Sequence, residues 1–149
     1  MTNIHETGLE IVSTRTFDAL PEVIFHAWIN PVLLKEWWGP KGFTNTFKEF
    51  DPKPGGRWDF VMHGPDGTDY TNSNIFVEVV EPRRIVFDHE SEPKFRLIAT
   101  FELKEGKTEI LFRMIFSNQT ELNKVKSYAP KANEENFDKL EALLSQTVL

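Results

Sequence analysis

The sequence of 149 residues contains no cysteine. Disulfide bonds, thiolate catalysis and cysteine-ligated zinc are therefore excluded, and nothing favours an oxidising compartment. No apolar run approaches the 18 residues that a membrane-spanning helix needs, and the first ten residues lack the apolar segment of a secretion signal. We therefore expect a cytoplasmic protein without a membrane span.

Basic residues are also in short supply. Lys and Arg number 17 against 23 Asp and Glu, which gives a formal net charge of −6. Binding to nucleic acid requires clustered cations that neutralise phosphates, and the basic residues of this chain are scattered. The sequence therefore predicts no nucleic-acid partner.

Tyrosine is rare, with 2 residues, whereas the chain has 13 Phe and 4 Trp. Phe carries no hydrogen-bonding group, so a Phe-rich chain needs a broad apolar interior. A domain of this length buries roughly 68–70% of its unfolded surface, and we expect one domain over residues 1–149, with residues 1–8 as a flexible tail. Composition leaves open whether the interior is a solid core or a lined cavity.

Hydrophobic patterns divide the chain into a strand, two short helices and a run of further strands. Alternation over residues 9–17 predicts the first strand. Pro21 suits the first position of a helix that Asn30-Pro31 ends, and a second helix is predicted over 32–37. Six further segments have the strand pattern: 43–50, 57–63, 70–80, 84–89, 95–104 and 108–116. Their short connections favour antiparallel pairing, because a parallel crossover needs about a dozen residues.

The last part of the sequence is predicted to be helical. One or two turns are expected over 120–127, Pro130 interrupts them, and Asn133 can cap the final helix. One apolar stripe recurs on that helix every three or four residues: Phe137, Leu140, Leu144 and Val148. The opposite side is predicted to face water, at Lys139, Glu141 and Gln146. The predicted fold class is α+β, with a curved antiparallel sheet wrapped around a long C-terminal helix.

Five motifs occur in a recognisable order: Arg15–Ala19, Trp37–Pro40, Pro54–Trp58, Met62–Gly67 and Glu81–Phe87. Together they resemble the SRPBCC (START-like, helix-grip) superfamily over residues 9–144, and within it the branch named for the activator of the heat-shock chaperone ATPase. The resemblance implies a cavity between sheet and C-terminal helix for lipids, sterols, polyketides or other apolar molecules. Two positions depart from the family pattern. Ala132-Asn133 stands where relatives often carry Gly-Trp before the last helix, and Asn74 replaces a Gly at the start of a strand.

The candidate ligand-binding residues are large apolar side chains that alternation or helical spacing turns inward. Trp37 and Trp38 stand beside the Gly39-Pro40 turn and are candidates for a cavity wall or gate. The complete set is Trp28, Trp37, Trp38, Phe47, Trp58, Phe60, Met62, Phe76, Phe87, Met114, Phe137 and Leu140.

Polar side chains offer weaker candidates. His89 is in register with Phe87, so it can project into the cavity and act as an acid or base, with Tyr70 as a second catalytic candidate. The favoured alternative is a hydrogen-bonded His at a strand end, because no partner residue accompanies it in the sequence. Arg15 and Arg113 are candidates for binding a carboxylate. The favoured alternative is that each extends to the outer face of the sheet or pairs across strands with Glu10, Glu102 or Glu109.

No metal and no cofactor are expected. The histidines, which include His5, His26 and His63, have no metal-ligand spacing, and no P-loop or dinucleotide fingerprint is present. The leading hypothesis is binding of an apolar or amphipathic small molecule by a monomer or homodimer. One alternative is a polyketide cyclase or hydrolase-like enzyme. The other is a co-chaperone or protein-interaction module, which would require a large exposed apolar patch.

Overall fold

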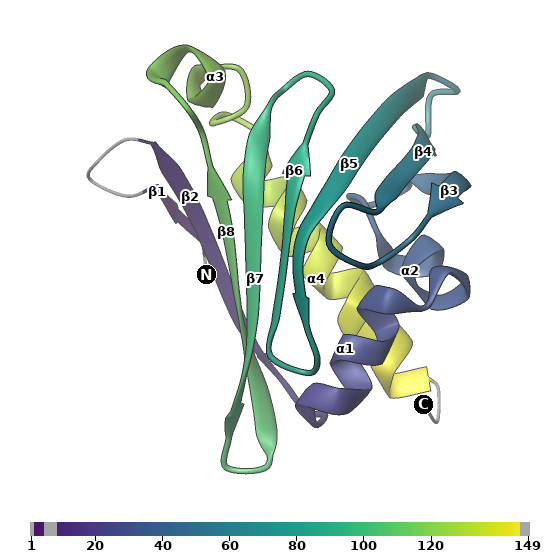
Figure 1. The fold of residues 1–149 in the computed structure, drawn as a ribbon, viewed down its shortest axis with the longest axis vertical. Coiled ribbons are helices and arrows are strands. Elements are labelled where there is room, and N and C mark those ends of the chain that lie inside the picture. The colour runs from purple at the N-terminus through teal and green to yellow at the C-terminus, as the bar shows by residue number, and fades with distance from the viewer. Residues whose placement is uncertain (1, 5–8, 147–149) are drawn as a thin grey trace.

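The computed structural model describes residues 2–4 and 9–146 (Figure 1). Within these ranges the elements are β1 (Thr2–Ile4), β2 (Glu10–Phe17), α1 (Pro21–Ile29), α2 (Pro31–Trp37), β3 (Thr44–Phe50), β4 (Arg57–His63), β5 (Asp69–Val80), β6 (Arg84–His89), β7 (Phe95–Lys104), β8 (Lys107–Ile115), α3 (Gln119–Asn123) and α4 (Ala129–Gln146). The strands predicted from residue 9 onward and the first two helices are confirmed, with ends shifted by at most one residue.

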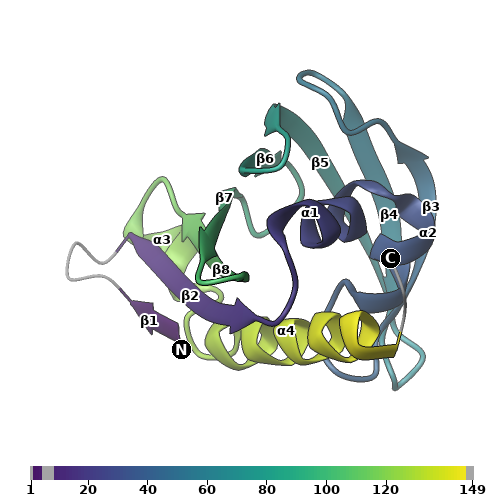
Figure 2. The same ribbon diagram turned by 90° about the horizontal axis from the view of Figure 1, so that it is seen from below.

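The strands form one antiparallel sheet in the order β1-β2-β8-β7-β6-β5-β4-β3. Strands β3 to β8 are neighbours in chain order, and β2 pairs with β8, so the first long strand lies beside the last one. Register shifts at Phe47/Glu49 and Phe76/Glu78 introduce irregularities that increase the local twist. The sheet curves, and α4 lies along its concave side (Figure 2). The predicted helix-grip arrangement is confirmed.

Helices α1 and α2 connect β2 to β3. A proline begins each helix, Pro21 and Pro31, and the side chain of Asn30 between them accepts a hydrogen bond from the Val32 N–H at 3.0 Å. The indole N–H of Trp37 donates to the Ala27 carbonyl at 3.0 Å and fixes the second helix on the first. This packing positions the end of α2 beside the sheet.

An aromatic core fills much of the space between sheet and helices. Trp58 stacks on Phe60 with ring centroids 4.6 Å apart and lies parallel to Phe76 at 6.2 Å. Trp28 contacts Trp37 edge-on at 5.1 Å. These five side chains are buried, so the Phe- and Trp-rich composition forms one continuous aromatic packing.

Helix α4 begins earlier than the sequence predicted. Pro130 is its second residue, where the missing N–H costs little because the first N–H groups of a helix have no partner within it. Asn133 therefore lies inside the helix and does not cap it. The preceding helix, α3, is also shorter than the turns predicted over 120–127.

The apolar stripe of α4 is confirmed where the structure describes it. Phe137 and Leu140 are buried and Leu144 is half-buried, whereas Val148 lies outside the described residues. On the other side Glu141 and Gln146 are exposed, as predicted.

Lys139 contradicts its prediction, because it is half-buried and does not face open water. Its Nζ donates to the carbonyl oxygens of Phe43 at 3.1 Å, Trp38 at 3.4 Å and Pro40 at 3.5 Å. Burial lowers its pKa below the ordinary lysine value. A long lysine stem can cross an apolar surface and still bring its charge to polar groups, and here these groups are carbonyls of the 38–43 loop.

The predicted flexible tail is wrong for residues 2–4. They form β1 and pair with β2 from Thr2↔Ser13 to Ile4↔Ile11. Residue 1 and residues 5–8, with His5, lie outside the described residues.

Candidate ligand-binding cavity

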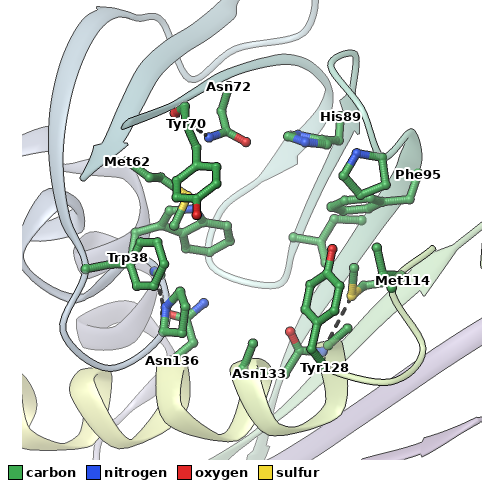
Figure 3. A pocket seen from close by; sticks show the side chains of 18 of the residues that line it. Trp38, Met62, Tyr70, Asn72, His89, Phe95, Met114, Tyr128, Asn133 and Asn136 are labelled. Atoms are coloured by element: carbon green, nitrogen blue, oxygen red, sulfur yellow. Dashed lines mark hydrogen bonds between the residues drawn. The ribbon is translucent and has the colours of Figure 1, made fainter. Parts of the chain in front are cut away.

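A cavity of about 920 Å³ lies between the concave face of the sheet and the first turns of α4 (Figure 3). Strands β4 to β8, the loop at 38–43 and the turn before α4 contribute its walls. Its main apolar lining consists of Trp38, Phe43, Phe60, Met62, Phe87, Phe95, Leu97, Phe112, Met114 and Val125. Two half-exposed tyrosines stand on the lining, Tyr70 from β5 and Tyr128 from the turn before α4.

The cavity follows from a change of side-chain size along α4. The first turns place four small side chains on the lining: Ala129, Ala132, Asn133 and Asn136. Phe137 and Leu140 follow and pack into the core. Alternation along the strands points large apolar side chains toward the helix. Because the helix residues opposite them are small, part of the space stays unfilled.

A glycine turn places Trp38 against the cavity. Gly39 has a φ of +98°, which L side chains rarely adopt, and a Cβ there would lie 2.6 Å from Met62 Cε. Three side chains of α4 hold the following loop. Asn136 Oδ1 accepts the Gly39 N–H at 3.1 Å, Glu135 Oε1 accepts the Lys41 N–H at 3.2 Å, and Lys139 binds the carbonyls named above.

Two buried asparagines rise from α4 into this site (Figure 3). Asn133 and Asn136 are 8% and 6% exposed. Asn133 Nδ2 donates to Ser13 Oγ at 3.1 Å and contacts Met114 Sδ at 3.5 Å. The other end of each amide, Asn133 Oδ1 and Asn136 Nδ2, has no hydrogen-bond partner in the described part of the chain. Each amide is thus oriented by the protein and retains one unused polar atom.

A second polar group lies on the opposite wall. His89 Nδ1 is 2.7 Å from Asn74 Oδ1, and because an amide oxygen only accepts, Nδ1 carries the proton. Nε2 is 3.3 Å from Ser91 Oγ, which also accepts the Ser73 N–H at 3.2 Å. The imidazole stacks on Phe95 with centroids 4.8 Å apart. Burial lowers the pKa of His89 to about 4, so it is neutral near pH 7.

Charged side chains on the lining are confined to its outer part. Lys41, Asp69, Glu92 and Lys131 are exposed, and Glu135 is half-buried. Among the described residues, the inner wall carries neutral amides and a neutral imidazole. No three histidine or acidic side chains of the described ranges gather into a group that could hold a metal ion.

A family model described as "Activator of Hsp90 ATPase homolog 1-like protein" matches residues 18–145. The chain belongs to this family. The match begins after β2 and runs to the last turn of α4, so it includes every residue that lines the cavity. No curated protein sequence matches the chain.

Solved structures of proteins from several bacteria share the fold of this Hsp90 ATPase activator-like domain. A protein from Arthrobacter aurescens superposes with a TM-score of 0.91 at 22% identity, covering 99% of this chain and 92% of that one. One from Rhodobacter sphaeroides gives 0.90 at 21% identity with 100% of both chains. Protein Ms6760 from Mycobacterium smegmatis gives 0.87 at 24% identity, with 100% and 98% covered. No helix of the described ranges is long and apolar enough to cross a membrane.

The structure brings some of the predicted site residues to the cavity of this family member and leaves others in the core. Lining residues among the candidates are Trp38, Phe60, Met62, Phe87 and Met114, together with Tyr70 and His89. The buried candidates away from the lining are Trp28, Trp37, Trp58, Phe76, Phe137 and Leu140. Phe47 is half-buried and packs on Trp58 and Phe60. Alternation shows that a side chain points inward but not whether another side chain already fills the space.

The two arginine candidates lie off the lining. Arg113 pairs with Glu10, which is one of the predicted partners. Arg15 pairs with Glu134 and Asp138 of α4, so its structural role is confirmed with partners that the strand pattern did not indicate.

Sequence reasoning did not name the amides of the site as ligand-binding residues, although Asn133 and Asn74 stand out there as departures from the family pattern. Asn133 precedes Phe137 by four residues and Asn136 precedes Leu140 by four, so they continue the apolar stripe of α4 toward its start. Asn74 stands two residues before the inward-facing Phe76 on β5. In each case the available signal was an asparagine at a position where the pattern requires a core residue.

Proposed function

We propose that this protein binds an apolar or amphipathic small molecule in the cavity between sheet and α4. The observation that carries the proposal is an aromatic-lined cavity of about 920 Å³ with a few fixed amides. Ligand sites are concave, mostly apolar and roughly 300–1,000 Å³ in volume, with a small number of placed polar groups. This cavity has each of those properties.

The size and polarity of the space favour a ligand over a packing defect. Cavities left by truncated core residues are on the order of 150 Å³, which is much smaller than this one. A defect would also not call for polar groups, because a buried amide without a partner costs free energy. The unused atoms of Asn133 and Asn136 are explained if a ligand, or water that a ligand displaces, completes their hydrogen bonds.

The geometry supports binding more than catalysis. Asn74, His89 and Ser91 form a row of hydrogen-bonded side chains that resembles the arrangement of an activated serine. However, Ser91 does not line the cavity, and its Oγ accepts the Ser73 N–H. A His with a pKa of about 4 is also a weak base near pH 7. These groups orient one another and bring no nucleophile to the cavity.

A cavity-filling variant tests the proposal. Ala132 lines the cavity, whereas Ala142 is exposed on the same helix. Ala132→Trp should weaken binding of the neutral dye Nile red at least about tenfold, since it occupies space that the dye needs. Ala142→Trp, the matched control, should bind the dye as the wild type does, and both should keep the circular dichroism spectrum. Dye binding that is equal in both variants, or absent from the wild type, would contradict the proposal. Native mass spectrometry of freshly purified protein would identify a retained ligand.

A further inference from the structure

We propose that the cavity selects an uncharged ligand whose polar head both accepts and donates a hydrogen bond, and that Asn136 and Asn133 are the residues that recognise this head. The simplest such head is a carboxamide on a flat apolar body. This inference rests on the proposed function and adds the chemical class of the ligand.

Asn136 presents a donor to the cavity. Its Oδ1 accepts the Gly39 N–H at 3.1 Å, and a backbone N–H can only donate, so the orientation of the amide is fixed. Nδ2 must therefore point away from Gly39, and it has no hydrogen-bond partner in the part of the chain that the structure describes. The residue is 94% buried, and it lies on the cavity lining. A ligand acceptor such as a carbonyl oxygen would complete the hydrogen bonding of this amide.

Asn133 presents an acceptor. Its Nδ2 faces Ser13 Oγ at 3.1 Å and Met114 Sδ at 3.5 Å, and a thioether sulfur can only accept. Oδ1 is therefore the end that is left for the cavity, where Figure 3 shows the side chain rising from α4. Residues three apart on a helix are neighbours on its surface, with Cβ atoms about 5–6 Å apart. One ligand head can thus reach both amides.

The charges around the cavity disfavour an anionic head. No Lys or Arg lies on the inner lining among the described residues, and the half-buried ammonium of Lys139 is held by three carbonyls of the 38–43 loop. His89 offers no positive charge, because its ring is buried against Phe95 and Asn74. The outer lining carries three carboxylates and two ammonium groups, on Asp69, Glu92, Glu135, Lys41 and Lys131. A carboxylate would lose its hydration without gaining a cation.

The apolar lining indicates the rest of the ligand. Phe60, Phe87 and Phe112 are buried, and each contributes its ring to the wall opposite α4. Aromatic walls favour flat ligands, which can make stacked or edge-on contacts with several rings. A fused aromatic body with the polar head directed at α4 is therefore the shape that this site would accept.

Two probes with the same ring system isolate the head group. Anthracene-2-carboxamide and anthracene-2-carboxylate differ in charge and in the two N–H donors that only the carboxamide has, and 2-methylanthracene lacks a polar head. Measured by fluorescence at about pH 8, where a carboxylate is ionised, the carboxamide should bind the wild type at least about tenfold more tightly than the carboxylate. A carboxylate that binds equally well or better would overturn the inference. If Nile red still binds in that case, the proposed function stands. If neither Nile red nor any of the three probes binds, both the proposed function and this inference are overturned.

Asn136→Asp tests the recognising residue. The substitution keeps an oxygen for the Gly39 N–H and replaces the cavity donor by a carboxylate. The affinity of the variant for the carboxamide should be at least about tenfold lower than that of the wild type. The variant should bind the cationic anthracene-2-carboxamidine, which the wild type should bind only weakly. Binding of the carboxamidine by the variant would show that the variant is folded. If the variant does not fold, Asn136→Ala should reduce the carboxamide affinity toward that of 2-methylanthracene, while the affinity for 2-methylanthracene is retained. Unchanged carboxamide affinity in either variant would overturn the assignment.

Discussion

Arg15 of β2 donates from Nη1 to Asp138 of α4 at 2.8 Å and so ties the first long strand to the last helix. Its other terminal nitrogen donates to Glu134 at 3.1 Å, and the guanidinium lies 5.5 Å from the centre of the Phe137 ring. One planar cation thus satisfies two carboxylates and packs on an aromatic face. This cluster fixes the middle of α4, beside the helix residues that line the cavity.

The Arg15 cluster should contribute more to stability than an exposed ion pair. Arg15→Met should lower the free energy of unfolding by about 1–2 kcal/mol, because it removes a partly buried network and a cation–π contact. Arg96→Met is the matched control, since the Arg96 side chain is 47% exposed against 20% for Arg15 and pairs with one carboxylate, that of Asp88. It should cost less than about 0.5 kcal/mol. Urea denaturation measures both values. Equal losses in the two variants would show that the network adds nothing to a surface pair.

Because of His89, we expect the free energy of unfolding to fall on mild acidification. Its pKa is about 4 in the folded protein and 6.5 in the absence of burial. Above pH 6.5 the ring is neutral in both states. As the pH falls from 6.5 to about 4, the unfolded chain takes up a proton that the folded protein excludes, so the free energy of unfolding falls by roughly 3 kcal/mol through this group.

The His89 contribution is isolated by His89→Gln, which does not titrate and can still hydrogen bond to Asn74. Urea denaturation at about pH 7 and about pH 4 should show a smaller acid loss in the variant than in the wild type, by roughly 3 kcal/mol. The same acid loss in both proteins would mean that His89 is protonated in the folded state near pH 5.

Much of the fold could be predicted because its signals are local. The alternation of residues 57–63 and the Pro21 helix start each depend on a few neighbouring residues. The start of α4 could not be fixed in the same way, because Pro130 is compatible with both the end of one helix and the beginning of the next.

The cavity was harder to predict because it depends on distant parts of the chain. Trp38 and Trp37 are adjacent in the sequence, yet one lines the cavity and the other donates to Ala27 in the core. Lys139 is polar in the sequence, but its carbonyl partners lie about a hundred residues earlier and come together only in the fold. The spacing of residues in the sequence predicts which way a side chain points. Whether the space in front of it is filled depends on tertiary packing and cannot be predicted from spacing.

Leu140 should behave as a core residue and not as a cavity wall. It is fully buried but does not line the cavity. Leu140→Ala should lower the free energy of unfolding by about 2–5 kcal/mol, as truncation of a buried leucine does, while Nile red affinity per folded molecule stays unchanged. Denaturation and dye titration on the same preparation separate the two effects. A marked change in dye affinity would mean that the cavity extends along α4 to this turn.

Gly39 and Gly67 provide the sharpest pair of matched substitutions. Their φ values are +98° and +87°, so alanine at either position should cost about 1–2 kcal/mol of backbone strain. A Cβ at Gly67 meets nothing within 4 Å, whereas one at Gly39 would lie 2.6 Å from Met62 Cε. Because Cε is the end of a flexible side chain, Met62 can move away, and the space open to it is the cavity.

Gly39→Ala should therefore weaken Nile red binding, and Gly67→Ala should leave it unchanged at a similar loss of stability. Adding Met62→Ala to Gly39→Ala should restore binding, since the displaced side chain is then absent and the non-additive part of a double-mutant cycle measures that contact. Thermal denaturation and dye titration of the wild type, the single variants Gly39→Ala, Met62→Ala and Gly67→Ala, and the double variant give both quantities. Weakened binding in Gly67→Ala would indicate a general effect of lower stability. Failure of Met62→Ala to restore binding would mean that Gly39 acts through the position of Trp38 and not through Met62.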